Sequence, residues 1–201
     1  MKIRQATFLD CDSLVKLHFD SQVEGVLKEL SSGLLADFYY KPMLLEKENQ
    51  IWVAHLEDGT IVGVISVTNL PNRNKSVGLR IGLRVGIELL IASVRKPSII
   101  MRSINFLLAH LFINSFISTR NESGFELQLL LVSGEYQNSG IGSALIRAVN
   151  TIVGDSTYCI VQTQNEEATK FYKRFGFEAV KRFHILGASL WIFKREGTHV
   201  E

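Results

Sequence analysis

An apolar stretch that leads directly into a glycine-rich turn constrains this 201-residue chain more than any other feature. Residues 125–132 predict a buried strand, residues 137–142 read Gln-Asn-Ser-Gly-Ile-Gly, and a helix with an apolar face follows. Glycine lets a ligand approach the backbone closely, and the first amides of a helix attract negative charge. The stretch therefore predicts a binding site for a phosphate group.

Two nucleotide-binding patterns can be tested against this turn. The dinucleotide pattern needs a third glycine where Leu145 stands. The phosphate-loop pattern needs a lysine between glycine and serine, but Ser143 follows Gly142 directly. Neither pattern is met. On the turn alone, the alternative that its glycines serve only the geometry of a strand–helix junction stays open.

The rest of the chain predicts an α/β fold with a mixed, mostly antiparallel central sheet flanked by helices. Helices are expected after residues 7–10 and at about 26–40, 141–152 and 165–174, with Phe19 and Ile152 among the buried residues. Tight turns at 57–60 and 185–187 require antiparallel pairing. The expected strands are 2–6, 51–56, 61–68, 125–132, 157–163, 177–184 and 188–193.

A basic and apolar segment interrupts this pattern at about residues 70–122. It predicts one helix before Pro97 and another at about 98–117, inserted between two strands of a single domain that spans 1–201. Residues 73–120 hold eight basic residues and one acidic residue, a net charge of +7. The segment can add to the core, form a lid whose arginines meet an anionic acceptor, or lie on an anionic membrane surface.

Composition argues against several classes of protein. A net charge of +2 does not favour general nucleic-acid binding. The only cysteines, Cys11 and Cys159, fit no metal motif, so no metal is expected and a reduced, cytoplasmic protein is predicted. Residues 1–5 do not open a signal peptide, and the longest apolar run, 103–118, is short for a membrane span.

A second motif lies downstream, where residues 165–177 read Asn-Glu-Glu-Ala-Thr-Lys-Phe-Tyr-Lys-Arg-Phe-Gly-Phe. With both motifs, the chain resembles the GNAT superfamily of acyl-CoA-dependent N-acyltransferases over about 1–69 and 123–195. The turn resembles the Arg/Gln-x-x-Gly-x-Gly/Ala loop of that family. Residues 165–177 resemble its Asn-x-x-Ala-x-x-Phe-Tyr-x-x-x-Gly-Phe stretch.

The resemblance implies a site for acyl-CoA, with an acetyl or short-chain acyl group. Main-chain groups of Leu130 and Val132 would pair with the pantetheine arm as an added strand would. Asn165 would bond the pantetheine or the backbone beside it. The backbone amides that would hold the pyrophosphate belong to Gln137, Asn138, Ser139, Gly140, Ile141, Gly142 and Ser143. Glutamine at 137 replaces the commoner arginine, which removes a charge but keeps a donor.

The resemblance also implies catalytic roles. Tyr172 stands where the family often places its general acid, and the alternative is a tyrosine packed on the sheet. Glu126 stands where some members place a general base, and the alternative is a solvated strand-edge glutamate. His110 and His184 are fallback bases.

The acceptor is expected opposite the coenzyme, near residues 20–25, where Glu24 could hold an ammonium group. A looser resemblance, over residues 24–40, is to family members from surface-polysaccharide gene sets. It implies acylation of the amino group of a nucleotide-linked (dTDP) amino-deoxy sugar. The alternatives are a non-catalytic acyl-CoA-binding module and a peptide or protein N-acetyltransferase. No nucleic-acid partner is expected, and the protein is expected to be a monomer or a homodimer.

Overall fold

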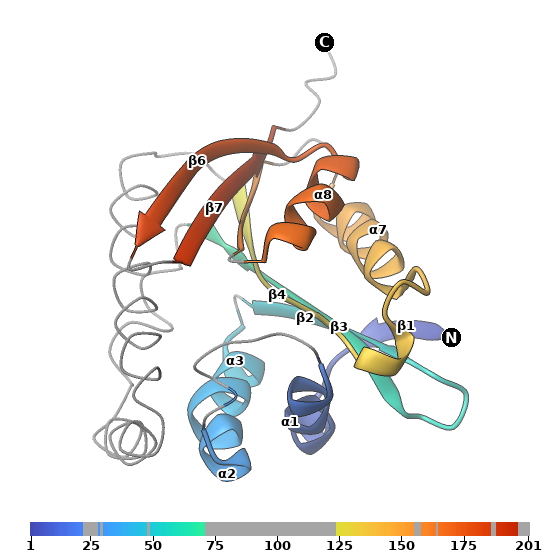
Figure 1. The fold of residues 1–201 in the computed structure, drawn as a ribbon. Helices are drawn as coiled ribbons and strands as arrows, with labels where there is room; N and C mark the ends of the chain where they lie inside the picture. Colours follow the sequence, from blue (N-terminus) through green and yellow to red (C-terminus); the bar gives the residue numbers. More distant parts are fainter. Residues whose placement is uncertain are drawn as a thin grey trace.

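One seven-stranded sheet organises the protein, with helices on both of its faces (Figure 1). The computed structural model describes residues 1–21, 28, 30–47, 49–70, 124–154, 158–163, 165–185 and 188–196. The strand order is β1-β2-β3-β4-β5-β7-β6, and of these neighbours only β4 and β5 run parallel. The predicted mixed, mostly antiparallel sheet is therefore confirmed. The strands are β1 (Lys2–Gln5), β2 (Asn49–His55), β3 (Ile61–Asn69), β4 (Gly124–Val132), β5 (Tyr158–Thr163), β6 (Glu178–Ile185) and β7 (Ala188–Arg195).

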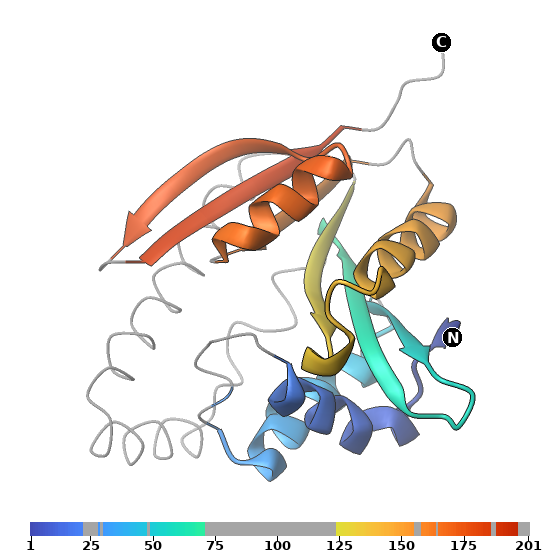
Figure 2. The ribbon, with the colours of Figure 1, turned by 45° about the vertical axis from the view of Figure 1, so that its right-hand side comes forward.

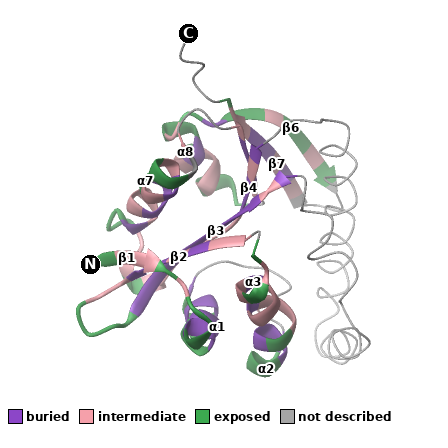
Figure 3. Ribbon diagram, turned by 180° about the vertical axis from the view of Figure 1, so that it is seen from behind, coloured by how far each residue is buried: buried purple, intermediate pink, exposed green. Residues whose placement is uncertain are grey.

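The helices form two layers, one on each face of the sheet (Figures 1 and 3). The first layer contains η1 (Phe8–Asp10), α1 (Cys11–Asp20), α2 (Ser32–Leu35), the π-helical turn η3 (Ala36–Tyr40) and α3 (Lys41–Leu45). The second contains α7 (Ile141–Val153) and α8 (Glu166–Arg174), and the short turn η5 (Gly134–Tyr136) leads towards it. Each layer packs its own apolar cluster against the sheet.

Strand β3 lies inside the sheet, between β2 and β4, and its residues are buried from Ile61 to Thr68. At Gly63 the sheet has no side chain on the side of α7. A Cβ there would lie 2.8 Å from the Ile141 side chain and 3.0 Å from that of Leu145. Glycine at this position therefore lets the first turn of α7 approach the sheet closely, which fixes the place of the glycine-rich turn before it.

Two predicted buried residues are exposed instead. Phe19 is 37% exposed and Ile152 is 44% exposed, so both predictions were wrong. In α1, the inward face follows the helical period through residues 11, 14, 15 and 18, and it buries His18 in place of Phe19. In α7 the buried face includes Ile146, while Ile152 lies near the end of the helix.

One predicted helix boundary was also wrong. The helix expected at about 26–40 is observed as a helical run from Ser32 to Leu45, and residues 22–27 lie outside the described part of the chain. The run continues past Tyr40 into α3, where Pro42 takes one of the first two positions.

The insertion predicted at about 70–122 lies almost entirely outside the described residues, as does His110. The register of β3 with β4 places Asn69 opposite Phe125, so the chain leaves β3 and enters β4 at the same end of the sheet. None of the helices within the described ranges combines the length and the hydropathy that crossing a bilayer needs.

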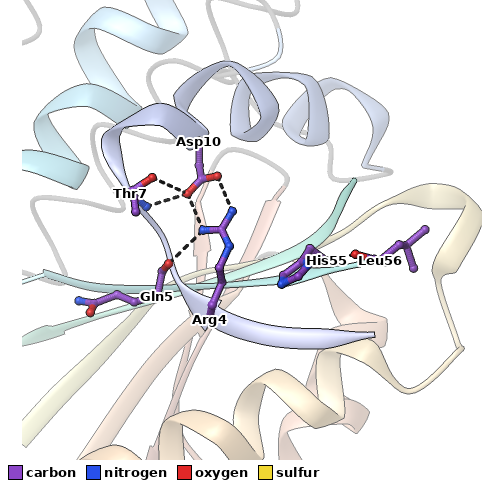
Figure 4. Close-up of polar contacts among 6 residues, drawn as sticks. All are labelled: Arg4, Gln5, Thr7, Asp10, His55 and Leu56. Atoms are coloured by element: carbon purple, nitrogen blue, oxygen red, sulfur yellow. Dashed lines mark hydrogen bonds and ion pairs between the residues drawn. The ribbon is translucent and has the colours of Figure 1, made fainter. Parts of the chain in front are cut away.

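A partly buried ion pair fixes the corner between β1 and α1 (Figure 4). The two terminal nitrogens of Arg4 donate to the two carboxylate oxygens of Asp10, each at 2.7 Å. The backbone amide of Thr7 and its hydroxyl also donate to Asp10, at 2.7 and 3.0 Å. These bonds, led by the one from Arg4, lower the pKa of Asp10 to about 2.

We expect Asp10→Asn to lower the free energy of unfolding at pH 7 by about 2 kcal/mol, the equivalent of this pKa shift. Because the pKa of Asp10 is lower in the folded chain, the stabilisation is complete above the unfolded value of roughly 3.9. It is lost as the pH falls towards about 2. Urea unfolding between pH 7 and pH 2 measures this, with the exposed Asp12→Asn as control. Equal stabilities of wild type and Asp10→Asn at pH 7 would show the prediction to be wrong.

Candidate active site

Strands β4 and β5 separate part of the way along their length. Their parallel register runs from Gly124↔Tyr158 to Leu127↔Val161 and ends there. Beyond this point β4 continues to Val132 along β3, while β5 continues to Thr163 along β7. Figure 2 shows β4 and the β6–β7 hairpin diverging. The far half of β4, with Leu130 and Val132, therefore has an edge that β5 does not cover.

The glycine-rich turn follows β4 and has an unusual backbone. Asn138 has φ 62° and Gly140 has φ 88°, both in the left-handed region. Gly140 caps α7 without a side chain, and the first helical hydrogen bond runs from the Ala144 amide to the Gly140 carbonyl. The amides of Ile141, Gly142 and Ser143 thus precede the helical ladder, in a turn where residues 138–140 are exposed. This geometry fits an anionic group.

The second motif lies beside this turn. A Cβ on Gly142 would lie 3.4 Å from the ring of Phe171 in α8, so this glycine lets the end of the first motif pack against the middle of the second. Asn165 caps α8, where its side-chain oxygen accepts a hydrogen bond of 2.9 Å from the Glu167 amide. That oxygen is used in the cap, so the amide hydrogens of Asn165 are the groups suited to meet a ligand.

Glu126 is buried rather than solvated, with 1% of its surface exposed. Phe125 and Leu127 pack in the cluster under α7 and α8, so Glu126, between them, faces the layer of α1–α3. The side-chain amide of Gln162 in β5 donates to Glu126 Oε1 at 3.0 Å. Thr68 lies opposite Glu126 in β3 and is also buried. A carboxylate therefore lies on the sheet at the point where β4 and β5 separate.

The π-helical turn η3 brings two consecutive tyrosines towards this face. Tyr40 is fully buried, and its hydroxyl lies 2.9 Å from Nδ1 of His18. Burial, with a smaller contribution from Lys28, lowers the pKa of His18 to about 4, so its ring is neutral at pH 7. Burial raises the pKa of Tyr39 to about 12, and the charge of Glu126 adds to the rise. Tyr39 therefore stays protonated near Glu126.

Tyr172 lies on the other face of the sheet, and 6% of its surface is exposed. Its ring packs edge-on against Phe171 and Phe177, with centroids 5.4 and 5.7 Å apart, and tilted against Phe193 at 6.2 Å. Burial raises the pKa of the Tyr172 hydroxyl above its usual range. The ring thus has a packing role, and the hydroxyl keeps its proton at physiological pH.

The remaining predicted residues are less closely associated with this region. His184 is exposed in β6, the outermost strand, with Nδ1 3.2 Å from the Ser189 hydroxyl. Glu24 lies outside the described residues. The end of α1 does approach the residue that follows β4, because Ser21 forms an isolated antiparallel bridge with Ser133. Within the described ranges, no group of three or more His, Cys, Asp or Glu residues could hold a metal ion.

Sequence reasoning missed Gln162 and Tyr39. Gln162 is two residues after Ile160, which lies opposite Glu126 in β5, but only the register of the two parallel strands reveals this. Tyr39 follows an ordinary helical pattern in the sequence, and the π-helical turn that brings it close to the sheet has no clear sequence signal.

Comparison with known proteins agrees with this geometry. Residues 106–179 match the Acetyltransferase (GNAT) domain family, a range that contains the turn and the second motif. The search of curated proteins found no match.

Three solved structures illustrate the shared fold. At their low sequence identities to this chain, they support a common fold, but they do not identify a substrate. The ribosomal-protein-S18-alanine N-acetyltransferase from Escherichia coli is 10% identical, with a TM-score of 0.59 over 100% of this chain and 96% of that one. NAA60 from Arabidopsis thaliana, in complex with acetyl-CoA, is 18% identical, with a TM-score of 0.56 over 96% of each chain. The PaiA N-acetyltransferase from Thermoplasma acidophilum, in complex with coenzyme A, is 14% identical, with a TM-score of 0.59 over 97% of this chain and 98% of that one.

Residues 106–179, which contain both motifs, are therefore similar to the acetyltransferase (GNAT) domain family, and the chain shares its fold with N-acetyltransferases of known structure.

Proposed function

We propose that the protein acylates a primary amine of a small molecule, with Glu126 as general base and Tyr172 as general acid. The observation that carries this proposal is the buried carboxylate of Glu126 at the point where β4 and β5 separate. Glu126 faces the α1–α3 layer, and Tyr172 lies under α7 and α8. An acceptor on the first face and a coenzyme on the second would meet between the two strands.

The coenzyme side is supported by the backbone of the turn. The amides from Gln137 to Ser143 would hold the pyrophosphate, because left-handed residues and an exposed helix start direct N–H groups towards an anion. The uncovered edge of β4 at Leu130 and Val132 would pair with the pantetheine arm. The amide hydrogens of Asn165 would supply a further bond.

Bound acyl-CoA supplies the acyl thioester that the amine attacks. Glu126 would take a proton from the acceptor ammonium, because only the neutral amine is a nucleophile. The Tyr172 hydroxyl would donate to the sulfur that leaves. Since burial raises its pKa, a hydrogen bond to the developing thiolate is more favourable than full release of the proton.

For the acceptor we propose a nucleotide-linked (dTDP) amino-deoxy sugar. Two sequence features support it: the net charge of +7 over residues 73–120, which complements a diphosphate, and the resemblance over residues 24–40. A peptide N-terminus is the second candidate. It is favoured by the shared fold with the Escherichia coli protein, named as an acetyltransferase of a ribosomal-protein alanine.

Replacing Gly140 by alanine tests the coenzyme turn. Gly140 and Gly59, in the β2–β3 turn, share a φ of +88°, and a Cβ on either would have no neighbour within 4 Å. Each alanine variant should therefore lose a similar stability, about 1 kcal/mol, from left-handed strain. Only the methyl at 140 would meet the pyrophosphate, so calorimetry should show affinity for coenzyme A about tenfold weaker in Gly140→Ala than in the matched control Gly59→Ala. Equal affinities would contradict this placement.

Replacing Tyr172 by phenylalanine separates its acid role from its packing role. The ring contacts remain, so stability and acyl-CoA affinity should stay close to wild type. We expect kcat to fall roughly a hundredfold, the usual contribution of a general acid. Thiol release measures the rate, and Tyr158→Phe, at the first residue of β5, is the matched control. An unchanged kcat would remove Tyr172 as the acid.

A panel of acceptors tests the proposed function itself. Thiol release is measured with acetyl-CoA and longer acyl-CoA donors against a dTDP-linked amino sugar, the same sugar without its nucleotide, a peptide with a free N-terminus and a polyamine. We expect the highest kcat/KM for the nucleotide-linked sugar and a loss of at least tenfold without the nucleotide. A preference for the peptide would support the second candidate. No transfer to any of these amines would overturn the proposed small-molecule activity.

A further inference from the structure

The side chain of Gln162 contacts the proposed base from the neighbouring strand. It belongs to β5, two residues after Ile160, which lies opposite Glu126 in the parallel register. Side chains two residues apart point to the same face of a strand, so Gln162 reaches diagonally back to Glu126. Its amide nitrogen donates to Glu126 Oε1 at 3.0 Å. The contact lies at the last paired residues before the two strands separate.

We propose that Gln162 is a positioning residue, which fixes the orientation of the Glu126 carboxylate and keeps it in the charged, proton-accepting form. The inference rests on the proposed function, in which Glu126 is the general base. Gln162 would not touch the reacting atoms, and it would act only through Glu126.

Burial makes this hydrogen bond important. A carboxylate with 1% of its surface exposed loses most of its contact with water, which favours the protonated form. A protonated carboxyl cannot accept a proton from an ammonium group. The Gln162 amide stabilises the carboxylate, and being neutral it adds no positive charge that would repel an ammonium acceptor.

The titratable neighbours do not replace this effect. Among the described residues, the charge of Glu126 adds to the pKa rise of Tyr39, in η3, and of Cys159, in β5. Burial is the larger cause in both, and the pKa values are raised to about 12 and about 11. Both groups are therefore neutral between roughly pH 5 and pH 9, the range in which the enzyme is assayed.

The proton transfer balances without another reactant. One N–H bond of the acceptor ammonium breaks, and its proton moves to the carboxylate that Gln162 holds. The neutral amine forms the C–N bond as the thioester C–S bond breaks. The nitrogen then loses a second proton, which passes to the leaving sulfur through the Tyr172 hydroxyl, so that the amide and the free thiol form and Tyr172 keeps its proton. Release of the Glu126 proton to water resets the base.

The test compares Gln162→Leu, which removes the donor, with Gln162→Glu, which adds a second carboxylate. Gln50→Leu is the matched control, because Gln50 is a half-buried β2 residue opposite Val67, whose side chain lies in the cluster under α7 and α8. Two quantities are measured on the full-length protein. One is the pH midpoint of the acid limb of the kcat/KM profile, obtained from thiol release with the best acceptor. The other is the protonation midpoint of Glu126 in the free protein, from carboxyl ¹³C NMR assigned with Glu126→Gln.

We expect both midpoints to move upward together, by about one pH unit in Gln162→Leu, the value of a hydrogen bond to a charged group. The shift should be larger in Gln162→Glu because like charges oppose ionisation. Gln50→Leu should leave both midpoints in place.

An unchanged NMR midpoint in both Gln162 variants would overturn the inference, because a hydrogen bond that serves only stability would alter the unfolding transition alone. A shifted NMR midpoint with an unshifted acid limb would also overturn it, since Glu126 would then not limit the reaction. If the wild type acylates no amine, the proposed function fails, and the NMR midpoints still decide whether Gln162 controls Glu126.

Discussion

Parallel pairing between β4 and β5 ends at Leu127↔Val161, and the candidate active site depends on that end. Up to this point the two strands form a continuous sheet that separates the two helical layers. Beyond it, β4 keeps β3 as its neighbour on one side only, and its other edge becomes available to a ligand strand. Residues from opposite faces can then act on one bond, which a continuous sheet would prevent.

Packing on both sides holds the two strands apart. On the β4 side, Gly63 lets Ile141 and Leu145 of α7 pack directly on β3, and the Ser133 amide donates to the Val62 carbonyl at 2.9 Å. On the β5 side, β7 pairs with every residue from Cys159 to Thr163, and β6 covers β7. Each strand therefore satisfies its backbone with a different partner. The two strands therefore diverge together with the parts of the sheet to which their outer edges are paired.

Local patterns in the sequence predicted most of the elements, because strand and helix periodicity and glycine turns depend on neighbouring residues. The glycine-rich turn and the Asn165 cap could be placed this way. The environment of Glu126 could not, since it depends on a parallel register between strands that are separated by a turn and a helix. The same limit explains why Glu126 could equally be read as a solvated strand-edge residue, and why Gln162 was not recognised as its partner.

Two buried carboxylates in this chain show how a partner decides the role of an acid. Asp10 receives a bidentate bond from the cation Arg4, which lowers its pKa to about 2 and makes it a poor proton acceptor. At the corner between β1 and α1, the role of Asp10 is to stabilise the fold. Glu126 receives a bond from the neutral amide of Gln162, which favours the carboxylate less strongly than a full positive charge does. A base must hold its charge before the reaction and still accept a proton during it. A neutral donor in a buried site meets both requirements, which a bidentate arginine at the same position would not.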